Sequence, residues 1–166
     1  MKIKISKGKG AGPTELSAFD SSLLDAGIAN YNLIYLSSII PPKTEIVIEE
    51  KGIMEVPGDW GDKLHVVIAQ ERTSVPNTEA WAGIGWVQDP KSKKGLFVEH
   101  HGHSKSTVKQ DIEDSLDALC LGRGIDFGEK KMVLQGNVCK DRPVCALVVA
   151  VYQATNWDNK PSFFKD

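Results

Sequence analysis

The feature of this sequence that most constrains its fold is the order of its strand-like and helix-like segments. Alternating or β-branched patterns predict strands at residues 2–5, 32–36, 45–48, 64–69, 80–87, 95–101, 131–138 and 144–154. Two helical patterns interrupt these strands without alternating regularly with them. The order predicts the α+β class, as a layered αββα-type sandwich of mostly antiparallel or mixed sheet with two main helices.

Each helical pattern is bounded by residues that suit helix ends. Thr14 is a candidate N-cap and Gly27 suits a left-handed C-terminal end, with apolar residues between them at positions 16, 19, 23 and 26. The second pattern begins with Ser106 as candidate N-cap, ends near residues 122–124, and has its apolar residues at positions 108, 112, 116 and 119. Three glycines and a proline within residues 8–13 predict a flexible loop before the first helix.

Composition and charge narrow the class of protein. The 166 residues, 41% hydrophobic and 25% charged, predict one globular domain spanning residues 1–166. The net charge is −2 and lysines are scattered among acids, so a nucleic-acid or membrane partner is not indicated. Three cysteines without zinc-type spacing and the lack of an apolar leader predict a reduced, cytoplasmic protein. The longest apolar run, residues 145–152, is far short of the roughly 20 residues that span a bilayer.

The dipeptide Ser37-Ser38 stands at the end of a predicted strand, shortly before Pro41 and Pro42. The prolines prevent the strand from continuing, so the chain has to turn there. A serine held in a strained turn can attack the preceding carbonyl and convert the peptide bond into an ester. Elimination followed by hydrolysis would then leave a pyruvoyl group at position 38. An ordinary strand-ending turn is the simpler interpretation of the dipeptide alone.

Longer motifs around this dipeptide resemble the pyruvoyl-dependent arginine decarboxylase family. They are LSAFDSSLLDAGIANYNLI at residues 16–34, LSSIIPP at residues 36–42 and GLFVEHHG at residues 95–102. A long composite motif is far more specific than a dipeptide. Residues 43–94 match the family loosely, with anchors at residues 56–57 and 61, and the closing strand matches only in its apolar character.

The resemblance implies a role for each residue that aligns with a family motif. Cleavage would fall between Ser37 and Ser38, giving chains 1–37 and 38–166, with Ser38 becoming the covalent pyruvoyl cofactor. Glu99 would be the proton donor, with its pKa raised by burial beside the apolar residues 96–98 of its own strand and those of a neighbouring subunit. The substrate-binding residues would be Asp20, facing the guanidinium, together with Asn32, Ser37 and Ile39.

The implied chemistry is decarboxylation of arginine to agmatine and CO2, and it requires no metal. A carbonyl cofactor forms a Schiff base with the substrate amine and accepts the electrons that decarboxylation releases. A carboxylate such as Asp20 suits a planar guanidinium, and such a charge-assisted hydrogen bond contributes about 1.5–3 kcal/mol. Without the family, Asp20 and Glu99 would be interpreted as solvent-facing acids, and Asn32 as a residue that bonds a neighbouring turn.

Other functions remain open at this point. In a strand, Glu99, His101 and His103 share one face, which is the pattern of a cupin-like metal site, although Gly102 is expected to break the strand. The role of His100 is not indicated. A non-catalytic assembly subunit with the same fold is a second rival. A decarboxylase of another amino acid is a third, because residues 52–61 can reshape the pocket.

The resemblance also implies self-association. Members of the family form homotrimers, sometimes paired into hexamers, with active sites at subunit contacts. Closed cyclic assemblies are common among soluble oligomers in general.

Overall fold

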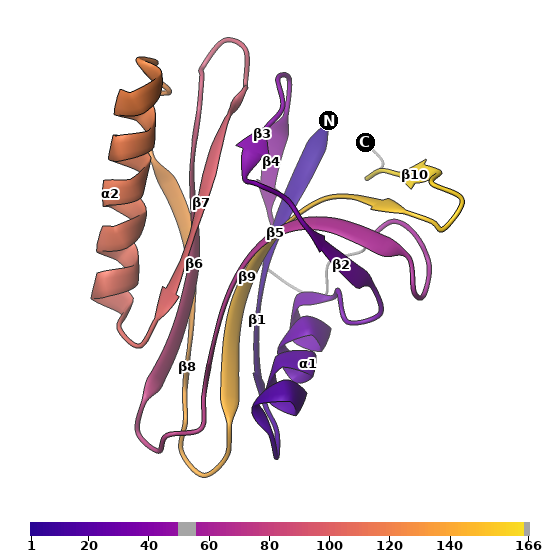
Figure 1. The fold of residues 1–166 in the computed structure, drawn as a ribbon, viewed down its shortest axis with the longest axis vertical. Helices are drawn as coiled ribbons and strands as arrows, with labels where there is room; N and C mark the ends of the chain where they lie inside the picture. The colour runs from indigo at the N-terminus through magenta and orange to yellow at the C-terminus, as the bar shows by residue number, and fades with distance from the viewer. Residues whose placement is uncertain (50–55, 165–166) are drawn as a thin grey trace.

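The computed structural model describes residues 1–49 and 56–164, which form two stacked sheets between helices α1 and α2 (Figure 1). Helix α1 (Glu15–Ala26) packs on the outer face of the first sheet, against β1 and β9. Helix α2 (Lys105–Arg123) covers the outer face of the second sheet, against β6 and β7. The predicted α+β sandwich is therefore confirmed.

The two sheets differ in strand direction. The first, sheet A, has the order β2-β5-β9-β1-β4 with β10 added on β9, and it is mixed because β2 and β4 pair in parallel with β5 and β1. The second, sheet B, is antiparallel in the order β3-β7-β6-β8. The bounds are β1 Lys2–Ala11, β2 Asn32–Tyr35, β3 Ile39–Ile40, β4 Glu45–Ile48, β5 Lys63–Thr73, β6 Glu79–Gln88, β7 Gly95–Gly102, β8 Lys131–Val138, β9 Val144–Thr155 and β10 Pro161–Ser162.

The hydrophobic core has three layers because each sheet is covered on both faces. Ile5, Ile84 and Phe97 belong to the layer between the sheets. A second layer joins α1 to sheet A, and a third joins α2 to sheet B through Ile112 and Leu116. Strand β9 contributes to the first two layers, and this explains why its sequence is almost continuously apolar.

The flexible loop expected at residues 8–13 is largely a strand. β1 continues to Ala11 and pairs with β9 along its whole second half. Its glycines allow the close approach of α1, because a Cβ at Gly8 would lie 2.1 Å from the Ser22 carbonyl oxygen and one at Gly10 would lie 2.3 Å from that of Ala18. The glycines therefore serve helix packing here, a use that composition does not distinguish from loop flexibility.

The capping predictions are confirmed for α1 and partly wrong for α2. Thr14 accepts a hydrogen bond from the Ser17 amide, and Gly27 closes the helix at φ 82°. The N-cap of α2 is Ser104, whereas Ser106 lies inside the first turn and contacts the Ser104 hydroxyl at 3.0 Å. Among the described residues no helix has the length and apolar character needed to cross a membrane.

Candidate active site

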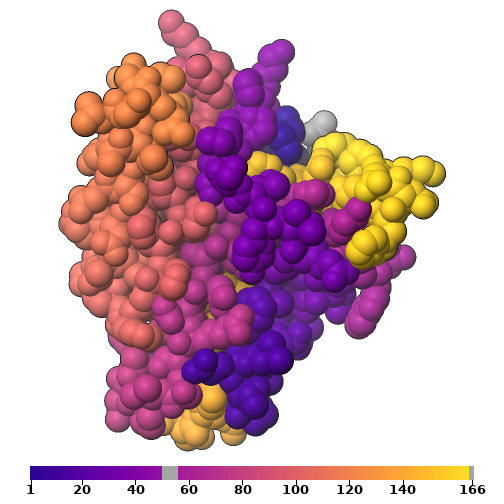
Figure 2. Space-filling view, viewed as in Figure 1, coloured from indigo at the N-terminus to yellow at the C-terminus, as the bar shows by residue number. Residues whose placement is uncertain are grey.

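Residues 36–38 carry the chain from one sheet to the other, between β2 in sheet A and β3 in sheet B (Figure 1). The Leu36 amide donates to the Val66 carbonyl at 2.9 Å, and the Ser38 carbonyl accepts from the Phe97 amide at 2.8 Å. The crossover is thus tied to sheet A at one end and to sheet B at the other. It lies at the surface, where the segment from β2 to β4 crosses the face seen in Figure 2, and Ser37 is exposed.

Ser38 combines an unusual backbone with an engaged hydroxyl. Its φ is +66°, a left-handed conformation that costs a non-glycine residue on the order of 1–3 kcal/mol. Its hydroxyl donates to the Glu99 carboxylate, with both oxygens at 2.8 Å from Oγ. A serine hydroxyl at this distance from a carboxylate can lose its proton to it. The structure therefore unites the predicted Ser38 and Glu99, which are 61 residues apart.

The alternation of β7 determines where Glu99 lies. Phe97 and Glu99 share the face of β7 that looks toward sheet A, with Phe97 in the core between the sheets and Glu99 at its exposed margin. Leu96 and Val98 face α2 instead. Glu99 is therefore exposed in the single chain, and the burial predicted for it depends on the apolar residues of a neighbouring subunit.

The remaining predicted substrate residues are dispersed. Ser37 and Ile39 flank Ser38, and the Ile39 side chain is 52% exposed. Asp20 is exposed on α1, which covers the outer face of sheet A. Asn32 begins β2, about 10 Å from Tyr35 along the strand, and its side-chain amide donates to the Gly61 carbonyl at 2.7 Å. Among the described residues, no hydrogen bond joins Asp20 or Asn32 to Ser38 or Glu99.

Tyr152 is a neighbour of the site that the sequence did not single out. It closes the apolar run of β9, is 5% exposed, and donates its hydroxyl to the Ile39 carbonyl at 3.0 Å. Burial raises the pKa of Tyr152, and the negative charge of Glu99 raises it further. The sequence could have indicated this residue, because a tyrosine at the end of a buried strand needs a hydrogen-bond partner for its hydroxyl.

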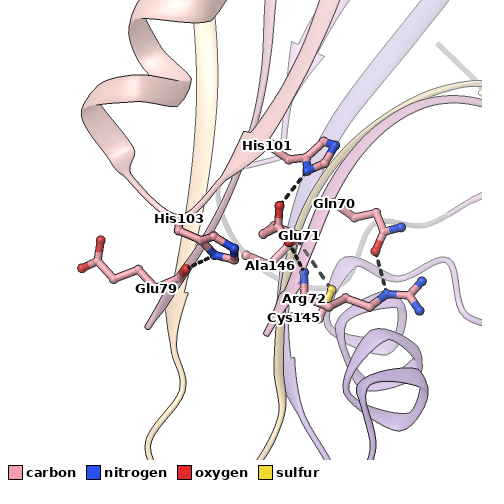
Figure 3. A network of polar contacts seen from close by, with 8 residues as sticks. All are labelled: Gln70, Glu71, Arg72, Glu79, His101, His103, Cys145 and Ala146. Atoms are coloured by element: carbon pink, nitrogen blue, oxygen red, sulfur yellow. Dashed lines mark hydrogen bonds and ion pairs between the residues drawn. The ribbon is translucent and has the colours of Figure 1, made fainter. Parts of the chain in front are cut away.

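The histidines of the alternative metal-site interpretation have other partners. His101 contacts the Glu71 carboxylate at 2.7 Å, and His103 contacts the Glu79 carbonyl at 2.9 Å, as Figure 3 shows. His100 points to the other face and contacts Ser115 on α2 at 2.8 Å. Across residues 1–49 and 56–164, no three histidine, cysteine or acidic side chains are grouped as metal ligands. In the described part of the chain, the alternation along this segment therefore does not bring Glu99, His101 and His103 together.

Residues 52–61 lie partly outside the described residues. In the described part, Gly58 and Gly61 adopt φ of 102° and 83°, and the Asp62 carboxylate accepts from the Asp59 amide at 2.9 Å. A hollow of about 430 Å³ lies between this turn and the end of α1. This turn lies next to Asn32, because it is the Gly61 carbonyl that accepts the Asn32 amide.

A family model and individual relatives that match this chain carry the same family name. The family model described as pyruvoyl-dependent arginine decarboxylase matches residues 2–156. A protein of that name from Halobacterium salinarum is 35% identical over 91% of this chain and 93% of its own length. Another from Thermococcus kodakarensis is 33% identical over 84% of this chain and 87% of its own length. A relative of the same name from Thermoplasma volcanium is 36% identical over 63% of this chain, and the match spans 57% of that relative.

Proposed function

Because this chain belongs to the pyruvoyl-dependent arginine decarboxylase family, we propose that it converts Ser38 into a pyruvoyl group and uses it to decarboxylate arginine to agmatine and CO2. The observation that carries the proposal is the contact of the Ser38 hydroxyl with the Glu99 carboxylate at 2.8 Å, within a strained crossover. The relatives named above support arginine as the substrate.

Self-processing begins with proton transfer from Ser38 to Glu99. The Ser38 oxygen attacks the carbonyl carbon of Ser37, the bond from that carbon to the Ser38 nitrogen breaks, and the nitrogen takes up a proton. The peptide bond is thereby replaced by an ester. Residue 38 then loses its Cα proton to solvent and the bond from its Cβ to the ester oxygen breaks, which releases the Ser37 carboxylate and leaves dehydroalanine at position 38. Water converts the dehydroalanine into the pyruvoyl group and ammonia. The left-handed backbone of Ser38 favours this sequence because cleavage releases its strain.

The surroundings of Ser38 fit such a group. Its carbonyl already accepts a main-chain hydrogen bond from Phe97, and the strand β3 that follows is paired with β7. When present, the pyruvoyl carbonyl takes up the substrate amine and accepts the electrons that leave the bond to CO2. Glu99 then stands beside residue 38 and returns a proton to the substrate carbon.

A second subunit is proposed to complete the site. Asp20 and Asn32 are separated from Ser38 within one chain, so a homotrimer, or two trimers paired as a hexamer, would bring them in from a neighbour. Exposed apolar side chains beside the crossover support an interface there: Ile34, Tyr35 and Ile39 are 40%, 62% and 52% exposed. The same contact would cover Glu99 and supply the burial that the single chain lacks.

Intact mass under denaturing conditions tests the proposed function most directly. We expect fragments of residues 1–37 and 38–166, the larger beginning with a carbonyl in place of an amine. The purified protein should then release CO2 from arginine and form agmatine. A folded but uncut chain would support a non-catalytic assembly subunit, and a cut chain inactive on arginine would support a different amino-acid substrate.

Replacing Asp20 with asparagine tests substrate recognition. We expect Asp20→Asn to raise the KM for arginine and to weaken discrimination against uncharged amino acids, because a neutral amide cannot pair with the guanidinium charge. Loss of a charge-assisted hydrogen bond of about 1.5–3 kcal/mol corresponds to roughly a 10- to 100-fold change in KM. Steady-state kinetics with arginine and an uncharged analogue measure both effects.

Asp25→Asn on the same helix is the matched control. Asparagine at position 25 can still accept the hydrogen bond that Asp25 receives from the Lys9 amide at 2.9 Å. The KM of Asp25→Asn for arginine should therefore equal that of the wild-type protein. Both variants should be cleaved normally. An unchanged arginine KM and selectivity in Asp20→Asn would show that Asp20 is only a surface acid.

A further inference from the structure

Tyr152 makes a hydrogen bond that the proposed chemistry does not use. It lies near the end of β9 in sheet A, whereas its acceptor, the Ile39 carbonyl, lies on β3 in sheet B. The distance is 3.0 Å, and the ring is 5% exposed. The hydrogen bond of Tyr152 therefore links sheet A to sheet B at Ile39, the residue that follows Ser38.

Phe97 couples this bond to Ser38 itself. Its amide donates to the Ser38 carbonyl at 2.8 Å, and its ring packs edge-on against the Tyr152 ring, with centroids 6.2 Å apart at 69°. The carbonyls of two consecutive residues, 38 and 39, are thus held by two side-by-side aromatic residues. With both carbonyls oriented, the peptide planes on either side of Ile39 are held relative to β7, the strand that carries Phe97 and Glu99.

Cleavage increases the importance of these anchors. Before it, residue 38 is held from both directions by the chain; afterwards it is the first residue of a new chain, and chain ends fray unless they are tied down. β3 has only two residues, paired with Leu96 and Gly95 of β7. The exposed Ile39 side chain contributes little burial, so the Ile39 carbonyl bond to Tyr152 restrains the new chain end together with the buried Ile40 and the Phe97 bond to the Ser38 carbonyl.

We propose that Tyr152 is a positioning residue, which anchors the chain end created at residue 38 and holds the pyruvoyl carbonyl in register with Glu99. This inference rests on the proposed function. The Tyr152 hydroxyl can donate this hydrogen bond at any physiological pH, because burial and the charge of Glu99 raise the pKa of Tyr152 and keep it protonated. Its ring supports Phe97, and its hydroxyl orients Ile39.

Tyr152→Phe separates the hydroxyl from the ring. We expect slower self-cleavage, followed by mass spectrometry over time, and a kcat per cleaved chain about tenfold lower with KM within about twofold. A readout independent of activity is hydrogen–deuterium exchange of the peptide that begins the larger fragment. Exchange there should be faster than in the cleaved wild-type protein.

Ser6→Ala is the matched control, because it removes a buried hydrogen bond from a hydroxyl to a carbonyl that joins β1 to the end of α1 and does not involve the crossover. The Ser6 hydroxyl donates to the Ala26 carbonyl at 3.0 Å, and the residue is 4% exposed. Both variants should lose a similar amount of thermal stability, but Ser6→Ala should retain wild-type kcat and wild-type exchange at the new chain end.

The possible outcomes distinguish the inference from the function on which it rests. Wild-type kcat per cleaved chain together with unchanged exchange in Tyr152→Phe would overturn the role of Tyr152 alone. An equal loss of kcat in Ser6→Ala would overturn it too, since the effect would then follow general stability. If the wild-type protein neither cleaves nor decarboxylates, the proposed function fails and the inference fails with it.

Discussion

Ser38→Ala is expected to remain a single uncut chain of 166 residues with no detectable decarboxylase activity. Alanine has no hydroxyl to attack the carbonyl of Ser37, so neither the ester nor the pyruvoyl group can form. The fold should persist, because Ser38 is only partly buried and alanine in the same left-handed conformation is strained to a similar degree. Denaturing gel electrophoresis and intact mass measure the cleavage, and a thermal melt checks the fold.

Ser37→Ala provides the control for cleavage. It changes the neighbouring side chain but retains the scissile carbonyl and the Ser38 to Glu99 contact, so two fragments should still form. Separation of Ser38→Ala into two fragments would refute attack by the Ser38 hydroxyl. Cleavage that is blocked equally in both variants would instead indicate a general disturbance of the crossover.

Glu99→Gln is expected to reduce kcat by about 10²–10⁴-fold, the usual contribution of general acid–base catalysis. Glutamine keeps the shape of the side chain but cannot deliver a proton to the substrate carbon. KM should change little, because the effect lies on the proton transfer that follows loss of CO2. Processing should slow as well, since the same carboxylate accepts the Ser38 proton.

These two effects of Glu99→Gln have to be measured separately. Activity is therefore normalised to the fraction of chain cleaved, determined by mass. Glu113→Gln, which changes a half-buried acid on α2 across sheet B, should match the wild-type protein in both cleavage and kcat. A cleaved Glu99→Gln protein with near-native kcat would remove Glu99 from the decarboxylation step and leave its role, if any, in processing.

Local features of the chain could be predicted because they depend on neighbours in sequence. The caps Thr14 and Gly27 follow from backbone hydrogen bonding at helix ends, and the strands from alternation or β-branched runs. Glycines can indicate either a loop or close packing of the backbone, and local patterns did not separate the two. Gly8 and Gly10 predicted a loop, but they lie in β1 against a helix that leaves no room for a Cβ.

The assembly of the site depended on contacts across the fold. The motifs identified Ser38 and Glu99, but only the switch of the chain from sheet A to sheet B, together with the pairing of β3 with β7, places them 2.8 Å apart. The separation of Asp20 and Asn32 from that pair has the same origin.

The sequence alone predicted most of the strands, both helices and the family motifs that contain Ser38 and Glu99. Tertiary structure decided the left-handed conformation of Ser38, the pairing of His101 with Glu71 and the bond from Tyr152 to Ile39. The physical reason is distance along the chain: caps and periodicity act over a few residues, whereas these contacts form between residues brought together by sheet register and layer packing, which no local pattern encodes.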